Sequence, residues 1–202
     1  MGNYGNKTNQ ILKLAHNSGV VSTGDVCSQG IHHEYLRKLC EEGKLIRVGR
    51  GLYSLPDVDV TVHHGFAQVG KAIPKSVICL LSALRFHAIG TQAPHEVWIA
   101  IDRRAARPQA RYPRLRIVRF SGGSLTEGID EHNVEGVPVR IYNPAKTVAD
   151  CFKYRNKIGL DVAIEALREV IRGRRCTTDD LWRYAKICRV TKIMRPYMEA
   201  IV

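Results

Sequence analysis

The sequence predicts an α+β protein with two domains, the second larger than the first. Two short apolar strands around a glycine turn at residues 49–51 follow a group of short helical patterns. Strand-like alternation returns in the middle of the chain, and helical periodicity dominates after residue 143. The change of pattern after Pro56 marks a boundary, so we expect domains at residues 1–57 and 58–202.

The first domain is expected to hold three helices and a hairpin. In chain order these are a helix at 7–17, a very short helix capped by Ser22 or Thr23, a helix at 31–42, and strands at 44–48 and 52–55. Gly43 stops the third helix, because glycine readily adopts the left-handed cap conformation. Three helices followed by a two-stranded hairpin is the order of a winged helix-turn-helix.

The second domain is expected to be a mixed α+β domain with strands in its middle. Helices are predicted at 60–73, 76–89, 144–154, 160–172, 178–187 and 191–201, and strands at 97–101, 115–120 and 136–142. The start at Asn143-Pro144 is the clearest, because asparagine caps a helix and proline suits its first position.

In a winged helix-turn-helix the third helix enters the major groove of DNA and the hairpin, or wing, contacts its backbone. The candidate DNA contacts of this recognition helix are the side chains that its apolar stripe leaves outside, namely His32, His33, Glu34, Arg37 and Lys38. On the wing the candidates are Arg47 and Arg50. The alternative is that these charges form an ordinary solvated face.

The net charge of +12 points to a polyanion partner, but it lies mostly outside the first domain. Residues 1–60 hold seven Lys or Arg and six Asp or Glu, a net of +1, which leaves +11 for the rest. Candidate contacts there are Arg103, Arg104, Arg107, Arg111, Arg114, Arg116, Arg168, Arg172, Arg174 and Arg175. Three interpretations stay open for them: a solvated face, a grip on the DNA backbone, or a surface for an acidic partner.

Several classes of protein are disfavoured by the sequence. No apolar run approaches membrane-spanning length and the N-terminus lacks a signal peptide, so we expect a cytoplasmic protein. The six cysteines form no CxxC pair, and Cys27, His32, His33 and Cys40 match no zinc finger, so no metal or other cofactor is expected. Partial catalytic motifs, such as Gly122-Gly123-Ser124 without alternating carboxylates, fail, so we expect no enzyme.

The run from Leu36 to Pro56 resembles the N-terminal winged-helix domain of AbiEi-type antitoxins, which carries the pattern L-x-x-L-x-x-x-G-x-L-x-R-x-x-x-G-x-Y. Ser82-Ala83-Leu84 followed by residues 94–100 is similar to a helix-to-strand passage of that family. Residues 143–152 resemble its helix with the pattern P-x-K-T-(V/L)-x-D. The simplest interpretation of Lys146 and Asp150, at i,i+4 spacing, is a surface ion pair, and a structural role is the preferred interpretation for both.

The resemblance implies a bacterial antitoxin that is also a transcriptional repressor, in an abortive-infection system of phage defence. Such a protein binds inverted repeats in its own promoter and counters a nucleotidyltransferase-like toxin, without necessarily forming a stable complex with it. The N-terminal domain then contacts double-stranded DNA and the C-terminal domain carries the antitoxin activity. The alternative is a plain winged-helix regulator whose C-terminal domain senses a signal or dimerises, with no toxin.

Overall fold

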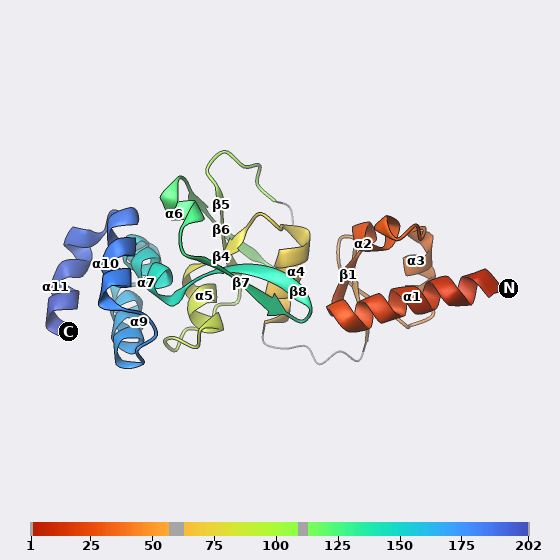
Figure 1. The fold of residues 1–202 in the computed structure, drawn as a ribbon, viewed down its shortest axis with the longest axis horizontal. Coiled ribbons are helices and arrows are strands. Elements are labelled where there is room, and N and C mark those ends of the chain that lie inside the picture. The colour runs from red at the N-terminus through yellow and green to blue at the C-terminus, as the bar shows by residue number, and fades with distance from the viewer. Residues whose placement is uncertain (1, 57–62, 109–112, 202) are drawn as a thin grey trace. The chain divides into compact units, whose positions relative to one another are not determined.

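A computed structural model of the chain describes residues 2–56, 63–108 and 113–201 (Figure 1). It confirms the predicted α+β class, with helices and two separate sheets. The chain divides into two compact units. The first unit comprises residues 1–74, 108–114 and 132–139, and the second comprises residues 75–107, 115–131 and 140–202.

The first unit is built from short helices and a small antiparallel sheet. Its helices are α1 (Gly2–Ser18), α2 (Thr23–Ser28), α3 (Glu34–Glu41) and α4 (His64–Ala72). Its sheet contains β1 (Val20–Ser22), β2 (Ile46–Gly49) and β3 (Leu52–Ser54) in the order β1-β3-β2. Ile11 and Ala15 of α1 and Leu36 and Leu39 of α3 are fully buried in one apolar cluster, which fixes the inward side of each helix.

The predicted order of three helices and a hairpin is confirmed, with differences in the bounds and one additional strand. α1 begins at Gly2 rather than Lys7, and β2 begins at Ile46 rather than Lys44. Residues 20–22 form a strand that pairs with β3, with Val21 opposite Tyr53, and a strand of three residues is too short to give an alternating pattern. The third helix starts at Glu34 rather than Ile31. Ser22 is the cap of α2, since its hydroxyl accepts from the Asp25 amide at 3.1 Å.

The larger sheet is mixed, with the strand order β6-β5-β4-β8-β7. Its strands are β4 (Val77–Ile78), β5 (Val97–Asp102), β6 (Leu115–Phe120), β7 (Ile129–Val134) and β8 (Val137–Tyr142). β4 is antiparallel to β5 and parallel to β8, and β5 is parallel to β6. The strands predicted at 97–101, 115–120 and 136–142 are therefore confirmed, as is the pairing of the last with the residues before it.

The remaining helices belong to the second unit. They are α5 (Leu80–Phe86), α6 (Gly123–Thr126), α7 (Pro144–Lys153), α8 (Arg155–Ile158), α9 (Leu160–Arg172), α10 (Thr178–Ile187) and α11 (Thr191–Ile201). The four predicted helices after residue 143 are confirmed almost to the residue. The Asn143 carboxamide caps α7 by accepting from the Lys146 amide at 2.9 Å, and Pro144 occupies its first turn.

The helix predicted over residues 76–89 is wrong at its start. Val77 and Ile78 form the central strand of the sheet, and α5 begins only at Leu80, whose φ is +48°. A fully buried strand and a buried helix give the same continuous apolar run, so periodicity does not separate them. The helix predicted at 60–73 is α4; its first expected residues, 60–62, lie outside the described part of the chain.

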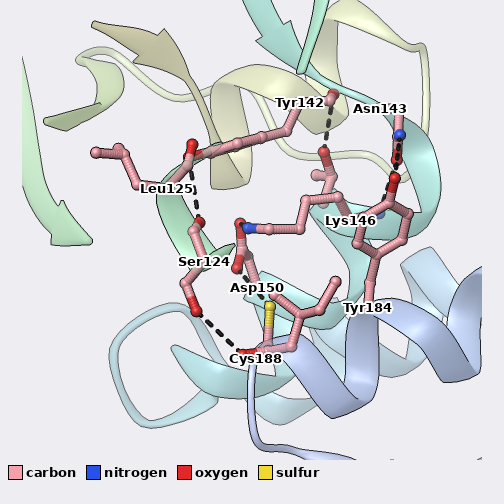
Figure 2. Close-up of polar contacts among 10 residues, drawn as sticks. Ser124, Leu125, Tyr142, Asn143, Lys146, Asp150, Tyr184 and Cys188 are labelled. Atoms are coloured by element: carbon pink, nitrogen blue, oxygen red, sulfur yellow. Dashed lines mark hydrogen bonds and ion pairs between the residues drawn. The ribbon is translucent and has the colours of Figure 1, made fainter. Parts of the chain in front are cut away.

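A buried ion pair lies at the centre of the second unit (Figure 2). The Lys146 ammonium lies 2.6 Å from the Asp150 carboxylate, and neither side chain has any exposed surface. The interpretation as a surface pair is therefore wrong. α7 is enclosed because α5, α9 and α10 all pack against it (Figure 1), so its polar residues Lys146, Thr147 and Asp150 are buried.

Polar and aromatic groups surround this pair. The Cys188 thiol donates to the second Asp150 oxygen at 3.2 Å, and the Lys146 ammonium lies 4.0 Å from the centre of the Tyr142 ring. The Tyr142 hydroxyl in turn donates to the Leu125 carbonyl at 2.8 Å. Burial raises the pKa of the Asp150 carboxyl, and the attraction of Lys146 opposes that rise.

One glycine permits this close approach. Gly128 has φ +75°, and a Cβ placed there would lie 2.8 Å from the Lys146 Cβ and 2.9 Å from the Tyr184 ring. Its carbonyl accepts from the Asn143 amide at 2.8 Å, directly before α7 begins. The backbone at residue 128 therefore seats the first turn of α7 at a spacing that only glycine allows.

Removing one member of the buried pair should destabilise the protein strongly, because the other charge would stay buried and uncompensated. We expect Lys146→Met and Asp150→Asn each to lower the free energy of unfolding by about 3–5 kcal/mol. The double variant Lys146→Met/Asp150→Asn should lose less than the sum of the two single changes. Urea unfolding followed by circular dichroism measures these differences.

The matched control is Glu41→Gln, which removes a carboxylate from an exposed i,i+4 pair with Arg37. It should change the free energy of unfolding by less than about 0.5 kcal/mol. Losses below about 1 kcal/mol in both single variants of the buried pair would show that the core does not depend on it.

Candidate nucleic-acid interface

The packing of α3 decides which of its side chains are available to a ligand. Leu36 and Leu39 are fully buried on the side that faces α1. Glu34, Arg37 and Lys38 are exposed, as the sequence predicts for side chains on the opposite side. The apolar stripe was therefore sufficient to orient this helix.

His32 and His33 do not belong to α3, contrary to the prediction. They precede its first residue, Glu34, and both are exposed. The Ile31 amide donates to the Val26 carbonyl at 3.2 Å, and the Ile31 side chain is buried, so this residue closes the turn after α2 instead of starting a helix. The two histidine rings lie against each other, with centroids 4.3 Å apart, and form the approach to α3.

Arg37 is held between two carboxylates of its own helix. One terminal guanidinium nitrogen lies 3.2 Å from Glu34, and the other lies 3.2 Å from Glu41. All three side chains are at least half exposed. Sequence reasoning included Arg37 and Glu34 but missed Glu41, although the i,i+4 spacing from Arg37 was a readable signal.

The predicted wing is tied to the start of α2. The Thr23 amide donates to the Gly51 carbonyl at 2.8 Å, which fixes the turn between β2 and β3. Both predicted wing arginines, Arg47 and Arg50, are exposed. The Arg47 guanidinium donates to the Gly49 carbonyl at 3.1 Å, so it lies along the turn.

In the second unit, Arg103 and Arg104 follow the end of β5. Together with Asp102 and Ser121 they line an open cavity of about 580 Å³. Arg119 does not line this cavity. Its guanidinium donates to the carbonyls of Asp102, Arg103 and Ala105 at 3.3, 2.9 and 2.8 Å. It positions the turn that presents Arg103 and Arg104.

The other predicted arginines are distributed over several elements. Exposed side chains are found at Arg107, Arg114, Arg116, Arg168, Arg172, Arg174 and Arg175. The Arg116 guanidinium lies over the Trp98 ring, 5.5 Å from its centre, and Arg175 donates to the His87 carbonyl at 2.7 Å. Arg111 lies outside the described residues. The structure groups Arg168 and Arg172 on α9, with Arg174 and Arg175 directly after it.

Two further findings concern the described residues only. Within them, no three His, Cys, Asp or Glu side chains are grouped to hold a metal ion. None of the helices they form is both long and apolar enough to span a membrane. Burial raises the pKa of the Cys151 and Cys188 thiols, that of Cys188 to about 12, so neither buried cysteine is an activated thiolate.

Comparison with solved structures gives a likeness over most of the chain. The fold is similar to the crystal structure of the RV2827C protein from Mycobacterium tuberculosis, with a TM-score of 0.56 and 13% sequence identity. The likeness covers 90% of this chain and 71% of that chain. At this identity it concerns the fold alone. No curated protein matches the sequence.

A family model matches the N-terminal part of the chain. The match covers residues 9–56, from within α1 to the end of the hairpin, and the family is described as "Transcriptional regulator, AbiEi antitoxin". These residues include the run from Leu36 to Pro56 on which the resemblance was recognised. The predicted resemblance is therefore confirmed over residues 9–56, which match the model of this family of AbiEi antitoxins and transcriptional regulators.

Proposed function

We propose that this protein is a DNA-binding repressor that also acts as an antitoxin. In this proposal residues 1–57 are a winged helix-turn-helix domain and residues 58–202 are the antitoxin domain. The observation that carries the DNA-binding part is the orientation of α3. Its buried leucines turn Glu34, Arg37 and Lys38 outward, within the segment that matches a family of transcriptional regulators.

The docking geometry follows from the element order. α3 lies in the major groove, where Arg37 and Lys38 reach guanine edges or phosphates. His32 and His33 directly precede α3. In the proposed complex they contact the DNA strand that borders the groove. Arg47 and Arg50 on the hairpin contact phosphates, which fixes the register of the domain on the duplex.

The basic excess of the second domain supports a further grip on the DNA backbone. Arg103 and Arg104 are exposed on a turn that Arg119 holds in place, so the backbone that carries them is already ordered before DNA binds. Arg107, Arg111, Arg114, Arg116, Arg168, Arg172, Arg174 and Arg175 are the other candidates. The competing use of this surface is an acidic partner, such as the toxin or its RNA substrate.

The antitoxin part of the proposal rests on the resemblance alone. The partner is a nucleotidyltransferase-like toxin encoded beside this chain, and the antitoxin counters it in the bacterial cytoplasm without catalysis of its own. The second candidate function is a plain winged-helix regulator with no toxin. It is favoured by one observation, because the family match covers the proposed DNA-binding segment and not the second domain.

The backbone grip should show as a change in salt dependence. Each phosphate contact adds about 0.9 to the slope of log affinity against log salt concentration. We expect the triple change of Arg103, Arg104 and Arg107 to Gln to lower that slope by roughly 2–3 on DNA from upstream of the chain's own gene. The ratio of affinities for this DNA and a scrambled duplex should stay constant.

The control is the triple change of Lys186, Lys192 and Arg195 to Gln, which removes the same charge from α10 and α11. It should leave the slope near that of the wild type. An unchanged slope in the first triple variant would remove this cluster from the DNA contacts. Absence of any preference for the upstream DNA in the wild type would contradict the repressor itself.

A substitution in the DNA-binding domain should lower repression and leave the antitoxin activity intact. We expect Arg37→Gln to reduce repression of a reporter under the chain's own promoter, because the substitution acts on the DNA-binding domain. The same variant should still restore growth to cells that express the neighbouring toxin. Colony counts with wild type, variant and empty vector measure the rescue. If the wild type itself does not rescue growth, the plain regulator remains.

A further inference from the structure

Four charged side chains occupy the exposed side of α3. Each of Glu34 and Glu41 lies three or four residues from both Arg37 and Lys38, so the four share one side of the helix, away from the buried Leu36 and Leu39. Two of them are acidic and two are basic. A recognition surface that bound DNA through charge alone would carry no carboxylates, so the two acids require an explanation.

The carboxylates act directly on Arg37. Its two terminal nitrogens are each 3.2 Å from a different carboxylate, one on Glu34 and one on Glu41. This arrangement spans two turns of helix and directs the guanidinium along the surface. It also compensates the arginine charge, so Arg37 offers little attraction to a passing phosphate. An end-on contact of Arg37 with a base edge uses the same two terminal nitrogens, so it competes with these ion pairs.

The chemistry of the base edges supplies the replacement. In the major groove, guanine presents two acceptors that suit an arginine, and its paired cytosine presents an amino group that donates to a carboxylate. A phosphate presents acceptors only. A G·C pair therefore satisfies both Arg37 and a carboxylate released from it, whereas a phosphate leaves that carboxylate repelled and without a donor.

We propose that Glu34 and Glu41 are specificity-determining residues, which hold Arg37 away from phosphates and release it to a G·C pair. This inference rests on the proposed DNA-binding function. It assigns to Glu41 a role in DNA recognition, and to both carboxylates a role against non-specific binding. The same side chains thus lower the affinity for random DNA and raise the ratio of specific to non-specific binding.

The test compares two duplexes of equal length and composition, one from upstream of the chain's own gene and one scrambled. Fluorescence anisotropy with the full-length protein gives both affinities. We expect Glu34→Gln and Glu41→Gln each to raise affinity for the scrambled duplex about threefold, and roughly tenfold together. Affinity for the upstream duplex should rise less or fall, so the ratio of the two should decrease.

The matched control is Glu42→Gln. Glu42 carries the same charge one residue further along, and its carboxylate lies 2.8 Å from Lys44 rather than against Arg37. We expect it to leave the ratio unchanged. If Glu42→Gln changes the ratio as much as Glu34→Gln or Glu41→Gln does, the effect comes from net charge alone and the proposal is overturned.

The two proposals fail in different ways. A wild type that binds the two duplexes with equal affinity contradicts the proposed sequence-specific repressor. If the wild type distinguishes the two duplexes and the Glu34→Gln/Glu41→Gln double variant has the same affinities as the wild type, only the role of the carboxylates is overturned. Because all three side chains are at least half exposed, the variants should keep the unfolding midpoint of the wild type, which thermal unfolding checks.

Discussion

The Lys146–Asp150 ion pair is the interaction around which the second unit is organised. Both side chains are completely buried, so the helices around α7 must enclose two charges and leave neither uncompensated. Cys188 brings a donor from the end of α10, and Tyr142 brings an aromatic face from the end of β8. Sheet and helices therefore meet at one polar centre, which disfavours other arrangements of the same apolar helices.

The sequence predicted those features that depend on local chemistry. The cap at Asn143 and the stripe of Leu36 and Leu39 were confirmed, because each acts within one helix. The burial of Lys146 was missed, since i,i+4 spacing says nothing of what packs over a helix. The strand at Val77 was also missed, because only its neighbours in the sheet distinguish it from a buried helix. Glu41 was not predicted as a site residue, although its i,i+4 spacing from Arg37 indicates an ion pair.

The DNA-binding sequence pattern lies in the first proposed domain, whereas most of the net positive charge lies in the second. Residues 1–60 carry a net charge of only +1 of the total +12. The exposed side of α3 has no net charge, because Arg37 and Lys38 balance Glu34 and Glu41. In our account this part selects a sequence, while the arginines that follow β5 and α9 supply affinity that does not depend on sequence. A division of this kind lets affinity and specificity vary independently.

The central claim is that α3 reads DNA in the major groove. Methylation interference with dimethyl sulfate tests it directly, since the reagent modifies guanine at N7 in the major groove and adenine at N3 in the minor groove. The DNA upstream of the gene would be methylated, bound by the full-length protein, and separated into free and bound fractions. Our account predicts interference from guanine N7 within the bound site. Interference from adenine N3 alone would contradict it.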